Sequence, residues 1–344
     1  MQAEESMKAA VFRGIGQIEV TDVLVPEVGP GEVLIRVAYC GICGSDLEAF
    51  QTGMYEPGLI IGHEFAGTIV ETGPGVTGWR AGDRVVVGDL IPCGQCRACR
   101  TGNLVACENI YMIGVTHDGG MAEYVKAPAV GLHRLPEGVS LRQGALVEPL
   151  TVALHGVRRS RLKPGDRAVV MGAGPIGLLT LQCARLAGAR SVIVTEVDPT
   201  RAALAARLGA TTVLDPVRDN LSVSLSELTD GLGPDVIFIC TGAPEPFAEA
   251  VSLVHKGGQI FLLGLPLQPV EADFFSVVMG ELSIEGSLAG WAEFPAAIDL
   301  IAQGRVDVEA LVSHEIPLDE GVAEWFTRLS APGSGAVKVL VRIS

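Results

Sequence analysis

The chain has 344 residues and a formal net charge of −15, and 48% of its residues are hydrophobic. A chain this acidic is a poor partner for nucleic acid or for anionic membrane surfaces, so we exclude both. The length predicts two domains, and the apolar content is sufficient for two buried cores. The first ten residues are polar and acidic, and no apolar run is long enough to span a membrane. We therefore expect a soluble cytoplasmic protein.

The first part of the chain reads as a series of short strands. Turn signals rich in Gly and Pro, such as VPEVGPGE, separate them. Many short strands with such turns predict a compact β-rich domain. The strand-like segments are residues 8–12, 18–23, 32–40, 65–73 and 83–88.

Four of the eight cysteines follow in one segment, CGQCRACRTGNLVAC. Cys93, Cys96, Cys99 and Cys107 have the spacing C-x2-C-x2-C-x7-C, which lets four thiolates converge on a tetrahedral Zn²⁺. Because four cysteines fill the coordination sphere, we predict a structural zinc site. A redox or disulfide loop is the alternative. An iron–sulfur run of the bacterial type would have a final gap of three followed by Pro, whereas here the gap is seven and Glu108 follows.

Beyond this loop the pattern becomes helical over residues 140–160 and then alternates between strands and helices. The alternation predicts a doubly wound parallel sheet of the α/β class. Helical segments return from about residue 290, and residues 336–344 read as a strand that returns to the first domain. The alternating segments are strand-like at 167–172, 191–196, 234–242 and 259–265, and helix-like at 175–188, 199–210 and 246–258.

Within this region, VVMGAGPIGLL contains the pattern G-x-G-x-x-G between a strand and a helix. Gly172 would form the tight turn, Gly174 would let a pyrophosphate approach the backbone, and Gly177 would let helix and strand pack closely. The free N–H groups at the helix N-terminus favour an anion. We predict a dinucleotide site here; a Gly-rich turn without a ligand is the alternative.

The identity of the dinucleotide depends on the end of the next strand. Glu196 stands there, and a carboxylate would accept hydrogen bonds from the adenosine ribose hydroxyls and repel a 2′-phosphate. We therefore predict NAD, although nearby Arg201 could accommodate the phosphate of NADP. We assign five more residues to the cofactor site: Pro175, Ile176, Thr241, Leu263 and Gly264.

A second set of possible metal ligands lies in CGICGSD, GHEFAG and VEPL. Cys43, His63, Glu64 and Glu148 supply four candidates. A catalytic zinc needs three protein ligands and one open position, so this set predicts a catalytic site. A lone His is more often a satisfied polar side chain, but the cysteine loop and the cofactor motif favour a ligand here.

Taken together, these segments resemble the zinc-containing medium-chain alcohol dehydrogenases over nearly the whole chain. GHE together with EPL is similar to the polyol branch, which includes sorbitol and butanediol dehydrogenases. The resemblance implies a GroES-like catalytic domain over residues 1–156 and 288–344, a Rossmann domain over residues 157–287, and a homotetramer or homodimer. The motifs that carry it, in the family's order, are CGICGSD, GHEFAG, GDRV, CGQCRACRTGNLVAC, DGGMAEYV, EPLTVALHG, GAGPIG and AVKVLV.

The resemblance also assigns roles at the catalytic metal. It implies that Cys43, His63 and Glu64 bind the catalytic zinc and that Glu148 lies at or beside it. Zn²⁺ with one thiolate, one neutral imidazole and one carboxylate sums to zero charge, and a permanent bond to Glu148 would make the sum −1. We therefore expect Glu148 to bind only transiently, or to hydrogen-bond the water on the zinc.

Three residues on the CGSDLE segment complete the implied site. The resemblance implies that Ser45 contacts the substrate oxygen and takes its proton, and that Asp46 supports the ligand histidine. Many relatives have His at the position of Glu48, where it ends a proton relay. We predict that Glu48 positions a water or binds a substrate hydroxyl rather than acting as the main base; a solvated surface carboxylate is the alternative.

These features imply an enzyme with two zinc ions per chain that transfers a hydride between a secondary alcohol, such as a polyol or vicinal diol, and NAD. A threonine-type amino-alcohol dehydrogenase is an alternative that Phe50 and Tyr55 cannot separate from the first. A zinc-stabilised nucleotide-binding protein without catalysis is another; one zinc per chain would favour it. Of the remaining cysteines, we place Cys183 and Cys240 in the core and Cys40 near the site without a metal.

Overall fold

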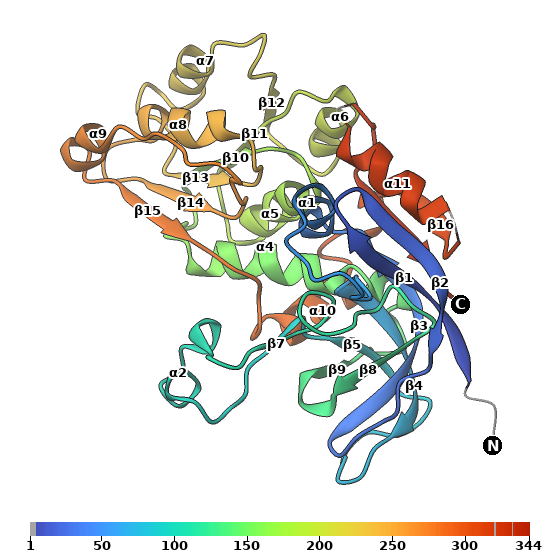
Figure 1. Cartoon of the computed structure of the whole chain (residues 1–344). Coiled ribbons are helices and arrows are strands. Elements are labelled where there is room, and N and C mark those ends of the chain that lie inside the picture. The colour runs from blue at the N-terminus through green and yellow to red at the C-terminus, as the bar shows by residue number, and fades with distance from the viewer. Residues whose placement is uncertain (1–4, 320, 332) are drawn as a thin grey trace. The chain divides into compact units, whose positions relative to one another are not determined.

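The computed structural model of the chain describes residues 5–319, 321–331 and 333–344. It divides into two compact units (Figure 1). We call residues 1–148, 294–303 and 312–344 the mixed-sheet unit, and residues 149–293 and 304–311 the parallel-sheet unit. The predicted domain boundaries at 156/157 and 287/288 stay a prediction.

The mixed-sheet unit is built around a sheet to which both ends of the chain contribute. Its described strands run in the order β16-β17-β3-β4-β5-β9, and β8 pairs with β3 on the side of this path. Two antiparallel ladders, β1 with β2 and β6 with β7, complete its strands. The strands are β1 (Ser6–Gly14), β2 (Gln17–Leu24), β3 (Glu32–Gly41), β4 (Glu64–Thr72), β5 (Arg84–Val87), β6 (Leu90–Ile91), β7 (Tyr111–Met112), β8 (Tyr124–Pro128), β9 (Leu132–Arg134), β16 (Val312–Pro317) and β17 (Lys338–Arg342).

The C-terminal strand β17 joins this sheet next to β3. Leu340 faces Gly41 and Val341 faces Cys40 in an antiparallel register. The apolar residues of β17 explain the pairing, because Val339, Leu340 and Val341 are buried. The predicted return of the last strand to the first part of the chain is confirmed.

Short helices connect the strands of this unit. Helix α1 (Gly44–Thr52) begins after Cys43, whose backbone N–H donates to Asp46 Oδ2 at 3.0 Å, and ends at Gly53 with φ of 76°. The acidic side chain in the first turn and the left-handed glycine therefore fix both ends of α1. The other helices are α2 (Arg97–Arg100), α3 (Leu141–Gly144), α10 (Phe294–Ala302) and α11 (Gly321–Ser330), with 3-10 turns at Leu104–Ala106 and Ala129–Gly131.

The parallel-sheet unit is a doubly wound α/β domain. Its described strands run in the order β12-β11-β10-β13-β14-β15, and every neighbouring pair is parallel. This is the Rossmann order, with the topological switch between β10 and β13. The predicted alternation is confirmed. The strands are β10 (Arg167–Met171), β11 (Ser191–Thr195), β12 (Thr212–Leu214), β13 (Val236–Ile239), β14 (Gln259–Leu262) and β15 (Ser283–Gly286).

Helices cover both faces of the parallel sheet, which is why its central strands are apolar along their whole length. Leu225 of α7 and Phe247 of α8 share a buried cluster with Val169, Ile237 and Ile260 of the strands. Within the described residues, no helix is long and apolar enough to cross a bilayer. The helices are α4 (Val147–Arg159), which begins in the mixed-sheet unit, α5 (Pro175–Leu186), α6 (Pro199–Arg207), α7 (Leu221–Leu228), α8 (Pro244–Leu253) and α9 (Phe274–Met279), with a 3-10 turn at Glu309–Leu311.

Candidate zinc and cofactor sites

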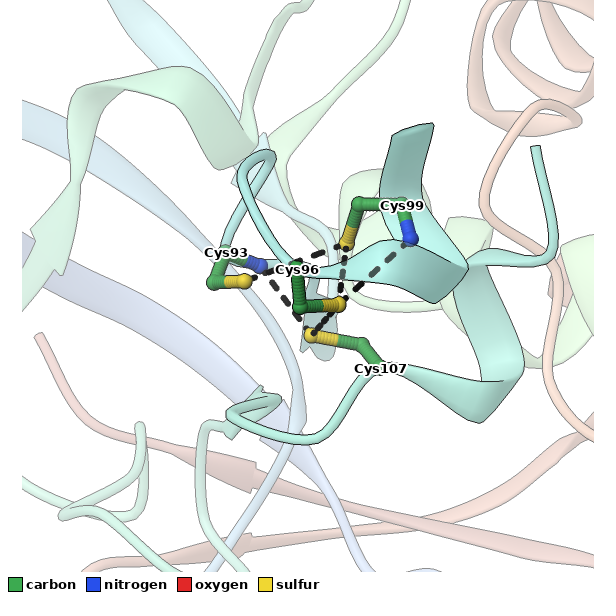
Figure 2. Close-up of side chains that lie close together, drawn as sticks. All are labelled: Cys93, Cys96, Cys99 and Cys107. Atoms are coloured by element: carbon green, nitrogen blue, oxygen red, sulfur yellow. Dashed lines mark hydrogen bonds between the residues drawn. The ribbon is translucent and has the colours of Figure 1, made fainter. Parts of the chain in front are cut away.

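The four cysteines of the loop point their sulfur atoms toward one another (Figure 2). The sulfur of Cys99 lies 3.9 Å from that of Cys93 and 3.5 Å from that of Cys96, and the sulfur atoms of Cys96 and Cys107 are 4.0 Å apart. Four sulfur atoms about 2.3 Å from one zinc at tetrahedral angles would be about 3.8 Å apart. The distances therefore fit a tetrahedral zinc.

The backbone of the loop favours the ionised form of some of these thiols. The N–H groups of Cys99 and Glu108 lower the pKa of Cys96 to about 6, whereas burial and the neighbouring Cys96 raise the pKa of Cys99 to about 12. Four thiolates this close therefore require a cation, as a structural zinc would supply. All eight cysteines are free thiols in the structure.

A second group of ligand atoms forms in the mixed-sheet unit. The sulfur of Cys43, a ring nitrogen of His63 and a carboxylate oxygen of Glu64 all lie within 4.8 Å of one another. Cys43 precedes α1, and His63 and Glu64 lie at the start of β4, with both side chains buried. One thiol, one imidazole and one carboxylate make a three-ligand set that suits a catalytic zinc.

Glu148 is buried near this group but does not belong to it. It is the second residue of α4, and it interacts electrostatically with His63 and Glu64. The arrangement of the predicted ligands is thus three together and one alongside.

Asp46 links the first turn of α1 to the histidine. Its Oδ2 accepts the hydrogen bond from the Cys43 backbone, and its Oδ1 lies 3.7 Å from His63 Nδ1. This distance exceeds a normal hydrogen bond, yet it places a carboxylate beside one ring nitrogen and leaves the other ring nitrogen for a ligand.

The electrostatics of this buried site call for additional positive charge. Burial raises the pKa of Cys43, of Asp46 and of Glu148. Burial also acts to lower the pKa of His63, but the neighbouring Cys43 and Asp46 outweigh it and raise that pKa well above its usual range. A divalent cation would stabilise the ionised ligands, and the donor set fits zinc.

Two buried charged residues of the site were missed in the sequence. Lys338 of β17 forms an ion pair with Glu64, and its Nζ donates to the Ile42 carbonyl at 2.9 Å. Asp89 is buried and interacts electrostatically with His63 and Glu148. In the sequence each is a single charge between apolar residues, in AVKVLV and VVVGDLIP, and that pattern was the available signal.

Gly41 gives the ion pair its space. A Cβ atom on Gly41 would lie 2.2 Å from Glu64 Oε2 and 3.1 Å from Lys338 Cε. Any larger residue there would displace the carboxylate, so the last residue of β3 is fixed as glycine by the site beside it.

Ser45 and Glu48 lie one turn apart on α1. Glu48 is half-buried, its Oε2 atom is inaccessible, and burial raises the pKa of its carboxyl group. The fold thus covers one of its oxygens, which speaks against the alternative of a solvated surface carboxylate. Its predicted role toward a water or a substrate hydroxyl stays a prediction.

The glycines of the cofactor motif differ in what surrounds them. Gly172 has φ of 96°, and a Cβ on Gly177 would lie 1.8 Å from the Gly172 carbonyl oxygen. A Cβ on Gly174 would meet no described atom within 4 Å, so this position is open. The turn requires glycine at position 172, and the close packing requires glycine at position 177. The open backbone at Gly174, next to the start of α5, suits a pyrophosphate.

Glu196 holds this turn in place. Its Oε2 accepts from the Ala173 backbone N–H at 2.7 Å, and its Oε1 accepts from those of Val197 and Asp198, both at 2.8 Å. Glu196 is buried and directly follows β11, at the edge of the sheet where the strands have their carboxyl ends. Three backbone donors fix its orientation.

The other predicted cofactor residues lie at the same edge. Pro175 and Ile176 open α5 after β10, and Arg201 lies in the first turn of α6, where its N–H donates to Asp198 at 3.0 Å. Thr241 follows β13, while Leu263 and Gly264 follow β14; a Cβ on Gly264 would lie 2.1 Å from the Thr241 carbonyl oxygen. Dinucleotides bind outside the carboxyl ends of such strands.

Of the remaining cysteines, Cys183 is buried as predicted, whereas Cys240, predicted in the core, is only partly buried because it follows the end of β13. Cys183 is buried in α5, and Cys240 is partly exposed at the end of β13 with its sulfur 3.7 Å from Thr180 Oγ1. Cys40 is buried near Asp46 and Glu64, and it does not belong to either metal-ligand group of the described residues.

Comparison with known proteins identifies the family of the chain. Two family models match: the alcohol dehydrogenase GroES-like domain over residues 29–137 and the zinc-binding dehydrogenase model over residues 175–303. The sorbitol dehydrogenase of Halalkalibacterium halodurans is 36% identical over 345 residues, which cover 97% of this chain and 99% of that one. The chain thus belongs to the zinc-containing medium-chain alcohol dehydrogenase family, an oxidoreductase family. Within it, the chain falls in the polyol branch.

Two solved structures are also similar over 98% of this chain and 99% of their own. The 2R,3R-butanediol dehydrogenase of Bacillus subtilis is 35% identical with a TM-score of 0.89. A zinc-binding dehydrogenase of Sinorhizobium meliloti 1021, bound to NADP, is 36% identical with a TM-score of 0.91. The GroES-like and Rossmann-like parts predicted from the sequence are confirmed.

The two metal-ligand groups lead to different expectations on mutation. Cys99→Ala should remove one zinc per chain and lower the melting temperature, because that metal only ties a loop. Cys43→Ala should also remove one zinc per chain, but it should abolish turnover in a folded protein that still binds NADH. Elemental analysis, thermal unfolding and NADH fluorescence measure these effects. Full activity in Cys43→Ala would contradict the catalytic assignment.

The buried ion pair should contribute to stability. Lys338→Met leaves Glu64 buried without its partner and should lower the free energy of unfolding by about 3 kcal/mol. The matched control is Lys126→Met, which breaks an ion pair with Glu32 that has a 3.7 Å separation and is partly exposed. The control should change stability by less than about 1 kcal/mol. Denaturant titration compares them, and equal losses would show that the Lys338 pair adds nothing specific.

Proposed function

We propose that the protein is an NAD-dependent zinc dehydrogenase that oxidises a secondary alcohol group of a polyol or vicinal diol. The observation that carries the proposal is the convergence of the ligand atoms of Cys43, His63 and Glu64, which lie within 4.8 Å of one another, with Ser45 two residues after Cys43 at the start of α1. The open backbone at Gly174 supports a dinucleotide in the other unit.

In this proposal Cys43, His63 and Glu64 hold the catalytic zinc. When bound, the zinc acts as a Lewis acid that lowers the pKa of the substrate hydroxyl, and NAD accepts the hydride. Ser45 relays the proton: its hydroxyl oxygen accepts the proton of the substrate hydroxyl while its own hydroxyl proton passes on toward solvent, and Asp46 holds the orientation of His63. Glu148 lies beside the ligand group, which suits a transient ligand or a hydrogen-bond acceptor better than a permanent fourth bond.

Lys338 enters the proposed charge balance of the site. Its positive charge beside Glu64 offsets the negative charge of the buried Asp46 carboxylate. Burial alone would lower the pKa of the Lys338 amine, but the neighbouring Glu64 outweighs this effect, raises that pKa and keeps the amine charged. With zinc at +2, Lys338 at +1, and Cys43, Glu64 and Asp46 at −1 each, the formal charges sum to zero, and burial raises the pKa of Glu148 and of Asp89, which favours their neutral forms. A site that is not strongly negative can stabilise the loss of a substrate proton.

The second zinc would be structural. The four sulfur atoms of the cysteine loop fill a tetrahedral sphere and leave no position for a substrate. We propose two zinc ions per chain with separate roles.

We propose that two or four copies of the chain associate. Strand β15 is an edge of the parallel sheet, and its backbone can pair with the same strand of a second copy. Next to it in sequence, helix α9 exposes four large apolar side chains, those of Phe274, Phe275, Val278 and Met279. Such a surface favours burial against another chain.

Initial rates with NAD and with NADP test the proposed activity. We expect turnover with vicinal diols or polyols, with a higher kcat/KM for NAD than for NADP. The panel includes 2,3-butanediol, sorbitol, xylitol and L-threonine. Turnover of L-threonine alone would favour the amino-alcohol alternative, and NADH binding with one zinc per chain and no turnover would favour the non-catalytic one.

The preference for NAD rests on Glu196. Glu196→Ser should remove the repulsion toward the 2′-phosphate and raise the kcat/KM ratio of NADP to NAD about tenfold or more. Because Glu196 also binds the Ala173 N–H, the same change should weaken NADH binding, which fluorescence titration measures. The control is Glu245→Ser at the exposed start of α8, which should change neither. A wild-type enzyme that prefers NADP would contradict this assignment.

A further inference from the structure

Two polar atoms near Ser45 are buried without a hydrogen-bond partner among the described residues: the hydroxyl oxygen of Tyr55 and Oε2 of Glu48. Buried polar groups are nearly always hydrogen-bonded, so each such atom calls for an explanation. Tyr55 interacts electrostatically with Glu48 and with the proposed zinc ligand Cys43, and neither Tyr55 nor Glu48 belongs to the set of metal ligands.

Tyr55 is held rigidly in this position. Its side chain is only 4% exposed and packs edge-on against Phe12, with ring centroids 6.2 Å apart. Its hydroxyl faces Ser45 without a hydrogen bond of normal geometry, and it lies within electrostatic reach of Cys43 and Glu48. The packing of the ring leaves the hydroxyl directed toward the first turn of α1.

Glu48 approaches the same place from the helix. It lies three residues after Ser45 on α1, and residues three apart on a helix share one face. The side chain is half-buried, and its unpartnered oxygen is covered by the protein. The hydroxyl of Tyr55 thus lies near Ser45 and within electrostatic reach of Glu48 and of the proposed zinc ligand Cys43.

We propose that Tyr55 and Glu48 form a hydroxyl-binding subsite that recognises the second hydroxyl group of a vicinal diol while Ser45 engages the first. This proposal rests on the proposed function and names its substrate class more closely. The pair is complementary to an alcohol, because a hydroxyl can donate its proton to the Glu48 carboxylate and accept the proton of the Tyr55 phenol. A substrate with one hydroxyl would leave both groups buried and unpaired, and such sites discriminate strongly against analogues that lack the group.

The test compares 2,3-butanediol with 2-butanol, which lacks the second hydroxyl. We expect wild type to prefer the diol in kcat/KM. Tyr55→Phe and Glu48→Ala should each lower the ratio of kcat/KM for the diol to kcat/KM for the mono-alcohol about tenfold. Most of this change should be a higher KM for the diol. Because both residues bind the same hydroxyl, the double variant should lose less than the product of the single losses.

Matched controls lie in the same unit. Tyr124→Phe removes the hydroxyl of a partly buried tyrosine in β8, and Glu324→Ala removes an exposed carboxylate in α11. Both should keep the wild-type ratio. Melting temperature and zinc content establish that each variant is folded, and if Tyr55→Phe fails to fold, Glu48→Ala decides the outcome.

The results separate the subsite from the proposed function. If wild type oxidises both alcohols and the variants lose equal factors on both, the two residues act through Ser45 and the subsite is refuted, while the proposed function stands. An unchanged ratio in both variants would refute it as well. If wild type oxidises neither these alcohols nor the polyols, the proposed function fails and the subsite fails with it.

Discussion

Burial of negative charge is the constraint on which the mixed-sheet unit depends. The thiol of Cys43 and the carboxyl groups of Asp46, Glu64 and Glu148 lie close together with little access to water. Taking such groups out of water is costly unless they are neutralised or paired. Among the described residues, the buried lysine that pairs with this group is Lys338, and the ligand geometry suits a divalent metal that would balance the remaining negative charge. The positive charges of Lys338 and of a bound divalent metal would together neutralise the buried negative groups of the site.

The strand that carries this cation also closes the sheet. Because β17 pairs with β3, the last residues of the chain bring Lys338 to Glu64, which opens β4 on the other side of β3. Gly41, at the end of β3, leaves room for both side chains. The same strand therefore contributes both to the sheet and to the charge balance of the site.

In the parallel-sheet unit, the constraint is a rigid turn that leaves backbone N–H groups open to an anion. Close packing at Gly177 holds α5 against the turn at Gly172, and Glu196 binds the Ala173 N–H from the next strand. These contacts hold the turn rigid while Gly174 stays open. The same carboxylate that is proposed to select NAD therefore also organises the loop, so cofactor preference and loop order cannot be altered independently.

The sequence alone determined the parts whose chemistry lies within a few residues: the four-cysteine loop, the glycine turn, and Ser45 and Asp46 just after Cys43. Their spacing fixes their geometry, because a short loop or a single helical turn has few conformations. The alternation of strands and helices likewise fixed the parallel fold. Only the tertiary structure decided that Lys338 meets Glu64, that Asp89 lies near Glu148, and that Glu48 is covered beside Tyr55. The physical reason is that burial and pairing across the sheet depend on strand order and register, which bring together residues far apart in the chain, such as Lys338 and Ile42, whose hydrogen bond joins residues 296 positions apart.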